Sequence, residues 1–341
     1  MRDSLAGVTP AGLRSAGVTG IGVSIPAKIL NNHDLEKMVD TSDEWITSRT
    51  GISERRILED DRSTSDIAAE AAQNALVSAG VRADQVDLVI VATCTPDMIF
   101  PATASLVQDR IGASKAAAFD LSAACSGLIY GMAVASQFVA TGVYNTVLVI
   151  GAEALSRITD WTDRSTCVLF GDGASAVVIQ PTPEGRGFLS FYLGSDGSGG
   201  EFLKIEAGGS RRPASLATVQ ERRHTIKMCG AEVFRFAVTV IPEAAQIALD
   251  RAGLTIEDID LFVPHQANDR IIDSSARRLG IPSEKVFSNV RLYGNTSAAS
   301  IGIALSEARD TGRLKTGDAV LLVGFGAGLS WASSVLRWSM E

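Results

Sequence analysis

Residues 71–80 read AAQNALVSAG, and residues 244–253 read AAQIALDRAG. Seven of the ten aligned positions are identical, at an offset of 244 − 71 = 173 residues. The offset continues without a gap beyond each helical pattern, where Asp87-Leu88 matches Asp260-Leu261. Chance similarity between two alanine-rich helices is the alternative, and this ungapped continuation argues against it. A repeat this long exceeds a solenoid unit and predicts two related half-domains about a pseudo-twofold axis.

Short runs rich in β-branched residues alternate with longer helical patterns along the chain. This alternation is typical of an α/β fold whose sheets are buried on both faces. Two predicted helices, 67–79 and 241–252, have apolar residues three and four apart. Each is followed by a glycine, Gly80 or Gly253, suited to a left-handed cap. The predicted strands are 18–23, 86–92, 146–150, 175–179, 259–263 and 319–323.

The composition narrows the class of protein. Of 341 residues, 46% are hydrophobic and only 21% are charged, which suits a large buried core. The net charge of −8 argues against nonspecific nucleic-acid binding. The four cysteines occur singly and there are only three histidines, so neither a disulfide framework nor a zinc site is expected.

No targeting or membrane segment is expected. The segment from Met1 to Gly17 lacks the apolar run of about 7–15 residues that a signal peptide requires. The longest apolar runs, such as 86–92, fall far short of the roughly 18 residues that span a bilayer. Together with the unpaired cysteines, these features predict a cytoplasmic protein that does not enter a membrane.

One cysteine has a sequence context suited to nucleophilic catalysis. Cys125 stands in SAACSG, residues 122–127, between a predicted strand end at 119–121 and a helical pattern that closes at Gly142. At such a turn the helix dipole and free backbone N–H groups are expected to stabilise the thiolate and lower the thiol's pKa. An isolated cysteine is otherwise most often a small buried hydrophobe. That interpretation is kept for Cys94, Cys167 and Cys229.

An imidazole and a carboxamide complete the set of groups needed for acyl chemistry. His265 stands in VPHQAN, residues 263–268, and Asn295 in YGNTSAA, residues 293–299. Each also has a simple structural interpretation, as a helix cap or a turn residue. Together, a neutral histidine and an asparagine can donate hydrogen bonds to a thioester oxygen as negative charge develops on it. The repeat offset places Cys125 opposite Ala298, so the two motifs are expected to face each other across the junction of the halves.

Three glycine-rich segments require an interpretation. GDGAS at 171–175 and SDGSGG at 195–200 lack the spacing of a P-loop or a dinucleotide fingerprint, so they are predicted as turns between strands. GFGAG at 324–328 follows a predicted strand and is expected to form a hairpin-like turn. Its backbone N–H groups are candidate oxyanion donors.

Taken in order, these motifs resemble the β-ketoacyl-[acyl-carrier-protein] synthase III family of condensing enzymes. The resemblance runs from about Val18 to Trp338 and rests on DEWI (43–46), RTGI (49–52), AAC (123–125), FGDG (170–173), PHQAN (264–268), GNTSAA (294–299) and GFG (324–326). It implies a thiolase-like α/β fold of two similar halves in an α-β-α-β-α arrangement, working as a homodimer. The expected domains are an extension at 1–15, a half at 16–185 with the nucleophile, and a half at 186–341 with the histidine and asparagine.

The resemblance also implies a reaction. Cys125 would attack a short acyl-CoA and release CoA, and malonyl-[acyl-carrier-protein] would then bind and lose CO2. His265 and Asn295 would stabilise the enolate, which attacks the acyl-cysteine to give the β-ketoacyl-carrier protein that starts fatty acid synthesis. Backbone N–H groups of Cys125 and Ala327 would form the oxyanion hole, although relatives often have glycine at the second position. No metal, flavin or nicotinamide cofactor is needed.

Three groups of binding residues carry over from the resemblance. The CoA contacts would be Trp45, Arg49, Thr50, Arg164 and Asn268, with Trp45 and Arg164 holding the adenine. The acyl pocket would include Leu155, Phe325 and Phe100, the last inserted by the partner subunit. The acidic carrier protein would dock on Arg235, Arg270, Arg277 and Arg278. From charge alone, the last two arginines fit a solvated helix face.

Other classes of protein remain open from the sequence. The order Cys, His, Asn also suits a papain-like cysteine hydrolase, with separations of 265 − 125 = 140 and 295 − 265 = 30 residues. The duplicated halves and the missing papain signature around the cysteine argue against it. A related condensing enzyme with another starter, or one that makes a secondary metabolite, would use the same acyl-cysteine. A noncatalytic binding protein is expected to have lost one of the three residues, and all are present.

Overall fold

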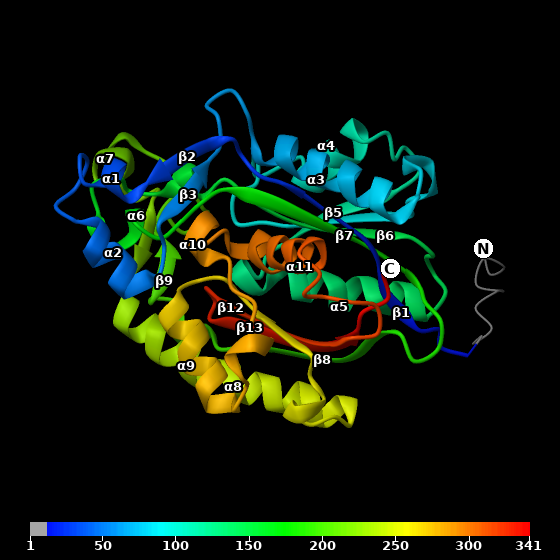
Figure 1. Ribbon diagram of the computed structural model, residues 1–341. Helices are drawn as coiled ribbons and strands as arrows, with labels where there is room; N and C mark the ends of the chain where they lie inside the picture. Colours follow the sequence, from blue (N-terminus) through cyan, green and yellow to red (C-terminus); the bar gives the residue numbers. More distant parts are fainter. Residues whose placement is uncertain (1–11) are drawn as a thin grey trace.

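The computed structural model describes residues 12–341 and contains two large β-sheets separated by a layer of helices (Figure 1). The first sheet has five strands in the order β1-β7-β6-β4-β5, and the second has four in the order β11-β12-β13-β8. The strands of the first sheet are β1 (Ala16–Ser24), β4 (Leu88–Ala92), β5 (Ala117–Leu121), β6 (Val147–Glu153) and β7 (Gly173–Pro181). Those of the second are β8 (Gly187–Ser195), β11 (Leu261–Pro264), β12 (Ala319–Gly326) and β13 (Ser330–Arg337).

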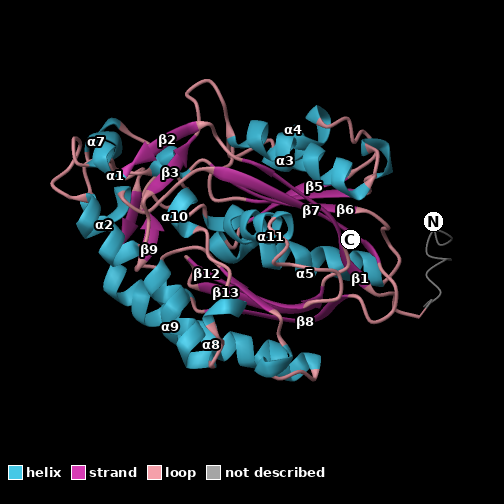
Figure 2. Ribbon diagram, viewed as in Figure 1, coloured by secondary structure: helices cyan, strands magenta, loops and turns pink. Residues whose placement is uncertain are grey.

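Helices complete the layers (Figure 2). α3 (Thr64–Ala79) and α4 (Thr103–Arg110) cover the outer face of the first sheet. α8 (Gly230–Ala252) covers the outer face of the second sheet, and α9 (Asp269–Leu279) packs against α8. α5 (Gly127–Ala140) and α11 (Ser300–Asp310) fill the middle, where their apolar side chains join both sheets in one core. The predicted α-β-α-β-α arrangement is confirmed.

Shorter elements gather to one side of the two sheets (Figure 1). β2 (Lys28–Asn31) pairs with β3 (Glu54–Ile57), and β9 (Leu203–Ile205) pairs with β10 (Ile226–Met228). The short helices are α1 (Asn32–Leu35), α2 (Asp43–Thr50), α6 (Arg164–Cys167), α7 (Leu216–Gln220) and α10 (Val290–Tyr293). Over residues 12–341, no helix is both long and apolar enough to span a membrane.

The repeat is visible in the fold. Adding 173 to the bounds of β4 gives 261–265, and β11 is Leu261–Pro264. Left-handed glycines end both repeated helices, as predicted: Gly80 has φ 65° and Gly253 has φ 66°. The duplication is not complete, because adding 173 to the bounds of β5 gives 290–294, where the chain forms the short helix α10 instead of a strand.

The predicted start of the second repeated helix is wrong. α8 begins at Gly230, not at 241, and continues through Pro242. Proline has no N–H to donate to the carbonyl four residues earlier. The guanidinium of Arg278, from α9, donates to that Val238 carbonyl instead. A partner distant in sequence thus compensates for a residue that normally ends a helix.

The glycine-rich segments have different structures. The segment 171–175 is not a turn throughout, because Gly173 begins β7, a strand paired with both β1 and β6. Small residues are needed there since Ser175 packs closely on the start of α11, donating its hydroxyl to Ala299 O (3.0 Å). The segment 195–200 does contain the predicted turn, a 3-10 turn at Gly197–Gly199. In the segment 324–328, residues 324–326 end β12, and the residues after them begin the turn of the predicted antiparallel hairpin with β13.

Candidate active site

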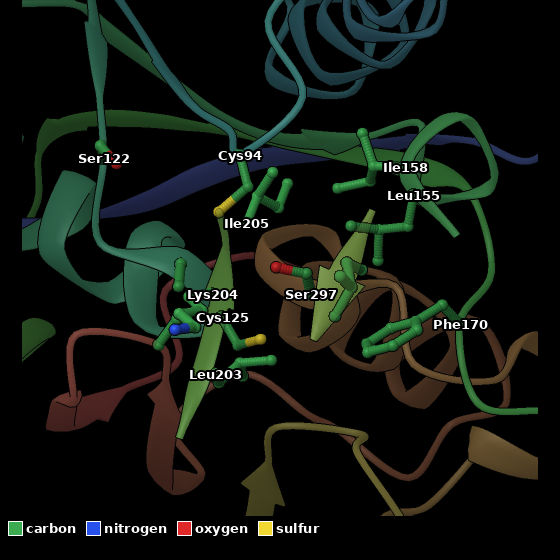
Figure 3. Close-up of a pocket in the computed structure, with 13 residues that line it drawn as sticks. Cys94, Ser122, Cys125, Leu155, Ile158, Phe170, Leu203, Lys204, Ile205 and Ser297 are labelled. Carbon is green, nitrogen blue, oxygen red and sulfur yellow. The ribbon is translucent and has the colours of Figure 1, made fainter. Parts of the chain in front are cut away.

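Cys125 lies where β5 leads into α5. A single 3-10 turn, η2 (Ala124–Ser126), precedes the helix. Ala124 has φ 46°, a left-handed conformation that turns the chain sharply just before the cysteine. Cys125 is 8% exposed and lines a cavity with Leu155 and Ser297. Figure 3 shows these side chains around the cavity, with the cysteine sulfur directed into it.

The thiol of Cys125 does not have the lowered pKa expected from its sequence context. Burial raises its pKa to about 12 and the nearby Glu153 carboxylate adds to the rise, whereas the neighbouring Ser297 hydroxyl and the cysteine's own backbone N–H lower it. The free energy needed to move a thiolate out of water exceeds the stabilisation that the nearby helix N-terminus provides. The resting nucleophile is therefore a thiol, and its proton has to leave as the new S–C bond forms.

His265 follows β11 directly and belongs to the opposite half of the repeat. Its Nδ1 lies 2.7 Å from Ser300 Oγ, the first residue of α11. The backbone N–H of Gln266 donates to the same oxygen (3.4 Å), which leaves the Ser300 hydroxyl proton for Nδ1. We therefore assign the ring proton to Nε2. Burial lowers the pKa of His265 to about 3, so the imidazole is a neutral donor at physiological pH.

Asn295 is oriented by its surroundings. Its backbone forms an isolated parallel bridge with Phe170. Its side-chain Oδ1 accepts from the Ser297 backbone N–H (2.8 Å), which leaves the Nδ2 group free to donate. Cys125, His265 and Asn295 line one cavity. The structure thus brings together the three groups that the sequence singles out.

The β12–β13 hairpin brings Ala327 next to the cysteine. A Cβ atom on Gly326 would lie 2.7 Å from the Cys125 backbone nitrogen, so only glycine permits this approach. Ser330 Oγ lies 3.0 Å from Ala123 O and 2.9 Å from Ala327 O, which ties the hairpin to the cysteine turn. Cys125 and Ala327 line the same cavity.

Trp45 stands against two guanidinium groups. The Cζ atoms of Arg49 and Arg164 each lie 4.9 Å from its ring centroid, in cation–π contact. Asn268 Nδ2 donates to Arg49 O (3.2 Å), and Asn268 also lines the cavity of the three catalytic candidates. These four side chains connect α2 and α6 with that cavity.

Thr50 is not available for the predicted contact with the CoA arm. The residue is 4% exposed, and its hydroxyl donates to Ile46 O (2.7 Å) and accepts from the Ile52 N–H (3.0 Å). The side chain therefore closes the end of α2. A local sequence motif does not reveal which of its polar residues is turned inward.

The three predicted acyl-pocket residues lie in different places. Leu155 is 3% exposed and lines the cavity around Cys125 (Figure 3). Phe325 lines the part near His265, with the two ring centroids 5.3 Å apart. Phe100 is 82% exposed, on a loop where Ile99 is also 84% exposed.

The four arginines predicted to dock a carrier protein lie on α8 and α9. The Cζ atom of Arg270 stands 5.7 Å from the ring of Phe234, which lines the cavity, so this arginine is near the site. Arg235 is exposed, although its guanidinium pairs with Glu232. Arg277 and Arg278 occupy the last turn of α9, and the guanidinium of Arg278 donates a hydrogen bond to the Val238 carbonyl.

Three polar residues of the site escaped the sequence reasoning: Glu153, Ser297 and Ser300. Ser297 and Ser300 lie in the segment that the repeat places opposite Cys125, so the offset already pointed to them. Glu153 ends β6, whose seven residues are all buried. An acidic residue at the end of a buried apolar strand is a detectable signal, because a buried carboxylate is costly.

Comparisons with known proteins agree with this geometry. The family described as 3-oxoacyl-[acyl-carrier-protein (ACP)] synthase III matches residues 119–197, and its C-terminal counterpart matches residues 249–338. The β-ketoacyl-[acyl-carrier-protein] synthase III of Caldanaerobacter subterraneus subsp. tengcongensis is 58% identical over 325 residues, which are 95% of this chain and 98% of that protein. The corresponding protein of Symbiobacterium thermophilum is 57% identical over 326 residues, 96% and 99% of the two chains.

The fold is shared as well. The crystal structure of β-ketoacyl-[acyl-carrier-protein] synthase III from Thermus thermophilus has a TM-score of 0.89 and 50% identity, and covers 95% of this chain and 99% of that one. These matches exclude the papain-like hydrolase that the order of Cys, His and Asn also allowed. The chain belongs to the β-ketoacyl-[acyl-carrier-protein] synthase III family, the acyltransferases that catalyse the initiating condensation of fatty acid synthesis.

Proposed function

We propose that the chain condenses a short acyl-CoA with malonyl-[acyl-carrier-protein] through an acyl-Cys125 intermediate. The products are CoA, CO2 and β-ketoacyl-[acyl-carrier-protein]. The observation that carries the proposal is the common cavity of Cys125, His265 and Asn295, which come from opposite halves of the repeat. A thiol beside two neutral hydrogen-bond donors suits acyl transfer followed by carbanion chemistry.

In the first half-reaction, the Cys125 sulfur attacks the thioester carbonyl of acyl-CoA. Negative charge develops on the carbonyl oxygen, and the backbone N–H groups of Cys125 and Ala327 donate to it. The bond between the carbonyl carbon and the CoA sulfur then breaks, which leaves the acyl group on Cys125. The contacts of Ser330 Oγ with Ala123 O and Ala327 O support this role, because they hold the cysteine turn and the hairpin together before substrate arrives.

In the second half-reaction, His265 and Asn295 donate to the thioester oxygen of the malonyl group. Loss of CO2 leaves an enolate, whose oxygen takes hydrogen bonds from Nε2 of His265 and Nδ2 of Asn295. The enolate carbon then attacks the acyl carbonyl, the bond from that carbon to the Cys125 sulfur breaks, and the released thiolate takes up one proton from solvent to restore the thiol. A protonated imidazole would hold the malonyl carboxylate by charge and so oppose its departure. The neutral state of His265 therefore favours this step.

For the CoA portion, we propose that the adenine stacks on Trp45 with Arg49 and Arg164 close by. Arg164 occupies the indole face now and donates to Asp40 O (2.7 Å), so the adenine enters by displacing that guanidinium. Asn268 contacts the arm that leads to the cavity. Thr50 is left out, because both hydrogen bonds of its hydroxyl are internal.

We propose a homodimer in which Phe100 of one subunit closes the acyl pocket of the other. Met98, Ile99 and Phe100 are 46%, 84% and 82% exposed in the single chain. Three consecutive exposed apolar side chains are costly in water and suit an interface. Leu155 and Phe325 line the pocket within one subunit.

The carrier protein is proposed to dock over α8 and α9, with Arg235 and Arg270 making the main contacts. Arg270 stands over a ring that lines the cavity, which suits delivery of a malonyl group tethered to an acidic protein. Arg277 adds charge at the far end of α9. Arg278 contributes less, because the Val238 carbonyl already engages its guanidinium.

The remaining proposals concern organisation. Residues 16–185 form the half with the nucleophile and 186–341 the half with His265 and Asn295; the strands of the two large sheets divide at the same point, between Pro181 and Gly187. Residues 1–11 of the predicted extension lie outside the described part of the chain. The reaction requires no cofactor, since the cysteine and the two donors supply each step. A cytoplasmic location fits four cysteines that are all free.

Intact-mass measurement of the purified protein with acetyl-CoA tests the proposal. Cys125→Ala should form no acyl adduct. His265→Ala and Asn295→Ala should keep the adduct but release CO2 from malonyl-[acyl-carrier-protein] about 100- to 1000-fold more slowly. Cys229→Ala, which alters an exposed cysteine, is the matched control and should behave as the wild type. An adduct on another cysteine contradicts the assignment, and rates with a panel of acyl-CoA primers identify the preferred starter.

A further inference from the structure

Glu153 is a buried carboxylate that the steps above do not use. It is 0% exposed at the end of β6. Its oxygens accept from the Cys94 backbone N–H (3.1 Å), the Thr95 hydroxyl (2.9 Å) and the Ser297 hydroxyl (2.9 Å). These partners are neutral, and within residues 12–341 no lysine or arginine pairs with it. A carboxylate buried without a counter-ion is costly, so its presence next to the nucleophile calls for a chemical reason.

Ser297 connects this carboxylate to the nucleophile. It opens the 3-10 turn η7 (Ser297–Ala299) with φ 46°, and its hydroxyl donates to Glu153 Oε1 (2.9 Å). Ser297 and Cys125 line the same cavity, and the serine hydroxyl is close enough to influence the pKa of the Cys125 thiol. In Figure 3 the Ser297 oxygen points into the cavity, between the sulfurs of Cys94 and Cys125. The order of groups is therefore thiol, hydroxyl, carboxylate.

We infer that Glu153 accepts the proton of Cys125 through the Ser297 hydroxyl when acyl-CoA acylates the cysteine. The inference rests on the proposed function, because it takes Cys125 as the nucleophile. As the sulfur bonds to the thioester carbon, its proton passes to Ser297 Oγ, and the serine's own proton passes to Glu153. When the bond to the CoA sulfur breaks, the proton returns by the same path to that sulfur. CoA leaves as a thiol and Glu153 is ionised again.

The charges around Glu153 fit this role. The titratable groups that face it are the thiols of Cys94 and Cys125, and the carboxylate charge raises the pKa of both thiols, so they stay protonated beside it. Burial raises the pKa of Glu153 to about 7, although its hydrogen bonds act in the opposite direction. At physiological pH a large fraction of Glu153 is therefore ionised and able to take a proton.

His265 is a much weaker base in this site. Burial holds its pKa at about 3, and Nδ1 is already engaged by Ser300. A proton taken from the thiol therefore rests more favourably on the Glu153 carboxylate than on the imidazole. His265 then stays neutral throughout the acylation step, as the later donation to the malonyl thioester requires.

Glu153 also holds the loop that carries Cys94 and Thr95, so the test has to separate proton transfer from support of the loop. The measurement is the single-turnover rate of Cys125 acylation by acetyl-CoA, followed by intact mass from about pH 5 to about pH 9. The wild-type rate should rise with pH as Glu153 ionises and then level off. Glu153→Gln should lack this rise and acylate about 100-fold more slowly above neutral pH.

Ser297→Ala interrupts the same path without removing the carboxylate, and should show the same loss. Alanine fits this position, because Ala124 has the same φ of 46° at the equivalent place in the other half. The matched control is Asp172→Asn. Asp172 is also 0% exposed and accepts from the Leu58 N–H (2.7 Å) and the Ser156 N–H (2.8 Å), away from the sulfur. This variant should lose stability but keep the wild-type pH profile.

An unchanged rate and pH profile in Glu153→Gln would leave the carboxylate a purely structural role and overturn the inference. If that variant does not fold, the profile of Ser297→Ala decides, and a wild-type profile again overturns the proton path. Failure of the proposed function has a different signature, since the wild-type protein itself would then form no adduct on Cys125.

Discussion

The cysteine turn and its counterpart in the second half have one backbone and two chemistries. Ala124 and Ser297 are related by 297 − 124 = 173 residues, and both have φ 46°. Each begins a 3-10 turn that leads into a central helix, η2 into α5 and η7 into α11. The left-handed residue and the turn were therefore kept in both halves, whereas the side chains diverged.

The divergence assigns a different task to each turn. The first turn presents the sulfur of Cys125, where the second has Ala298. The second turn and the helix start that follows it present two hydroxyls: Ser297 reaches Glu153 and Ser300 reaches His265, at 2.9 and 2.7 Å. One half thus supplies the nucleophile, and the other orients the groups that act on it. Duplication preserved a geometry, and single side chains within it decide the chemistry.

The largest effect is expected from exchanging the sulfur between the two turns. A double variant, Cys125→Ala with Ala298→Cys, should form no acyl adduct with acetyl-CoA by intact mass. Ala298 is 1% exposed, and its Cβ lies 3.5 Å from where a Gly127 side chain would start, so a sulfur there is enclosed between the two central helices. Acylation of the introduced sulfur would mean that the two turns are functionally interchangeable.

A smaller effect is expected when Ser300, the first residue of α11, is replaced by the residue at the equivalent place in the first half. Gly127 and Ser300 are equivalent, since 300 − 127 = 173. Ser300→Gly removes the hydroxyl at His265 Nδ1, and one lost hydrogen bond should slow malonyl decarboxylation by about tenfold. Acylation of Cys125 should be unaffected. Ser306→Ala, on the same helix and 4% exposed, is the control, and an equal loss in both variants would point to a general effect on α11.

The smallest effect concerns the pH dependence of the free energy of unfolding. Glu153 in the first half and His265 in the second should change this free energy in opposite directions. The pKa of His265 is lowered from 6.5 to about 3, so the unfolded chain binds the proton more tightly, and stability falls as pH drops below 6.5. The pKa of Glu153 is raised from 4.5 to about 7, so the folded chain binds the proton more tightly, and stability falls as pH rises above 4.5.

Between these values the two contributions partly cancel. Glu153→Gln removes one of them, so the free energy of unfolding should rise with pH more steeply than in the wild type, by about 1 kcal/mol per pH unit. Urea unfolding at a series of pH values measures this slope. A wild-type slope in Glu153→Gln would show that Glu153 is ionised or protonated equally in both states.

Patterns that act over short distances were open to prediction from sequence. The ungapped repeat predicted two related halves, helical and strand periodicity predicted an α/β fold, and the glycines after α3 and α8 marked the ends of those helices. Cys125, His265 and Asn295 were identifiable because each stands in a motif of small or polar residues, and Cys125 and His265 also follow a strand end. The hairpin at 324–328 was identifiable from its glycines. In each case the residues that determine the structure are neighbours in sequence.

Tertiary structure alone decided the ionisation states and the partners of the site. The pKa of Cys125 depends on burial, which outweighs the nearby helix start that sequence reveals. Glu153 and Ser297 are 144 residues apart, and no local sequence pattern predicts their contact. The same holds for Pro242, tolerated in α8 because Arg278 reaches the carbonyl it leaves unpaired. The order of residues sets which groups are present and how each turn is shaped. Desolvation and pairing depend on residues distant along the chain, so only the folded structure decided how those groups ionise and which of them act together.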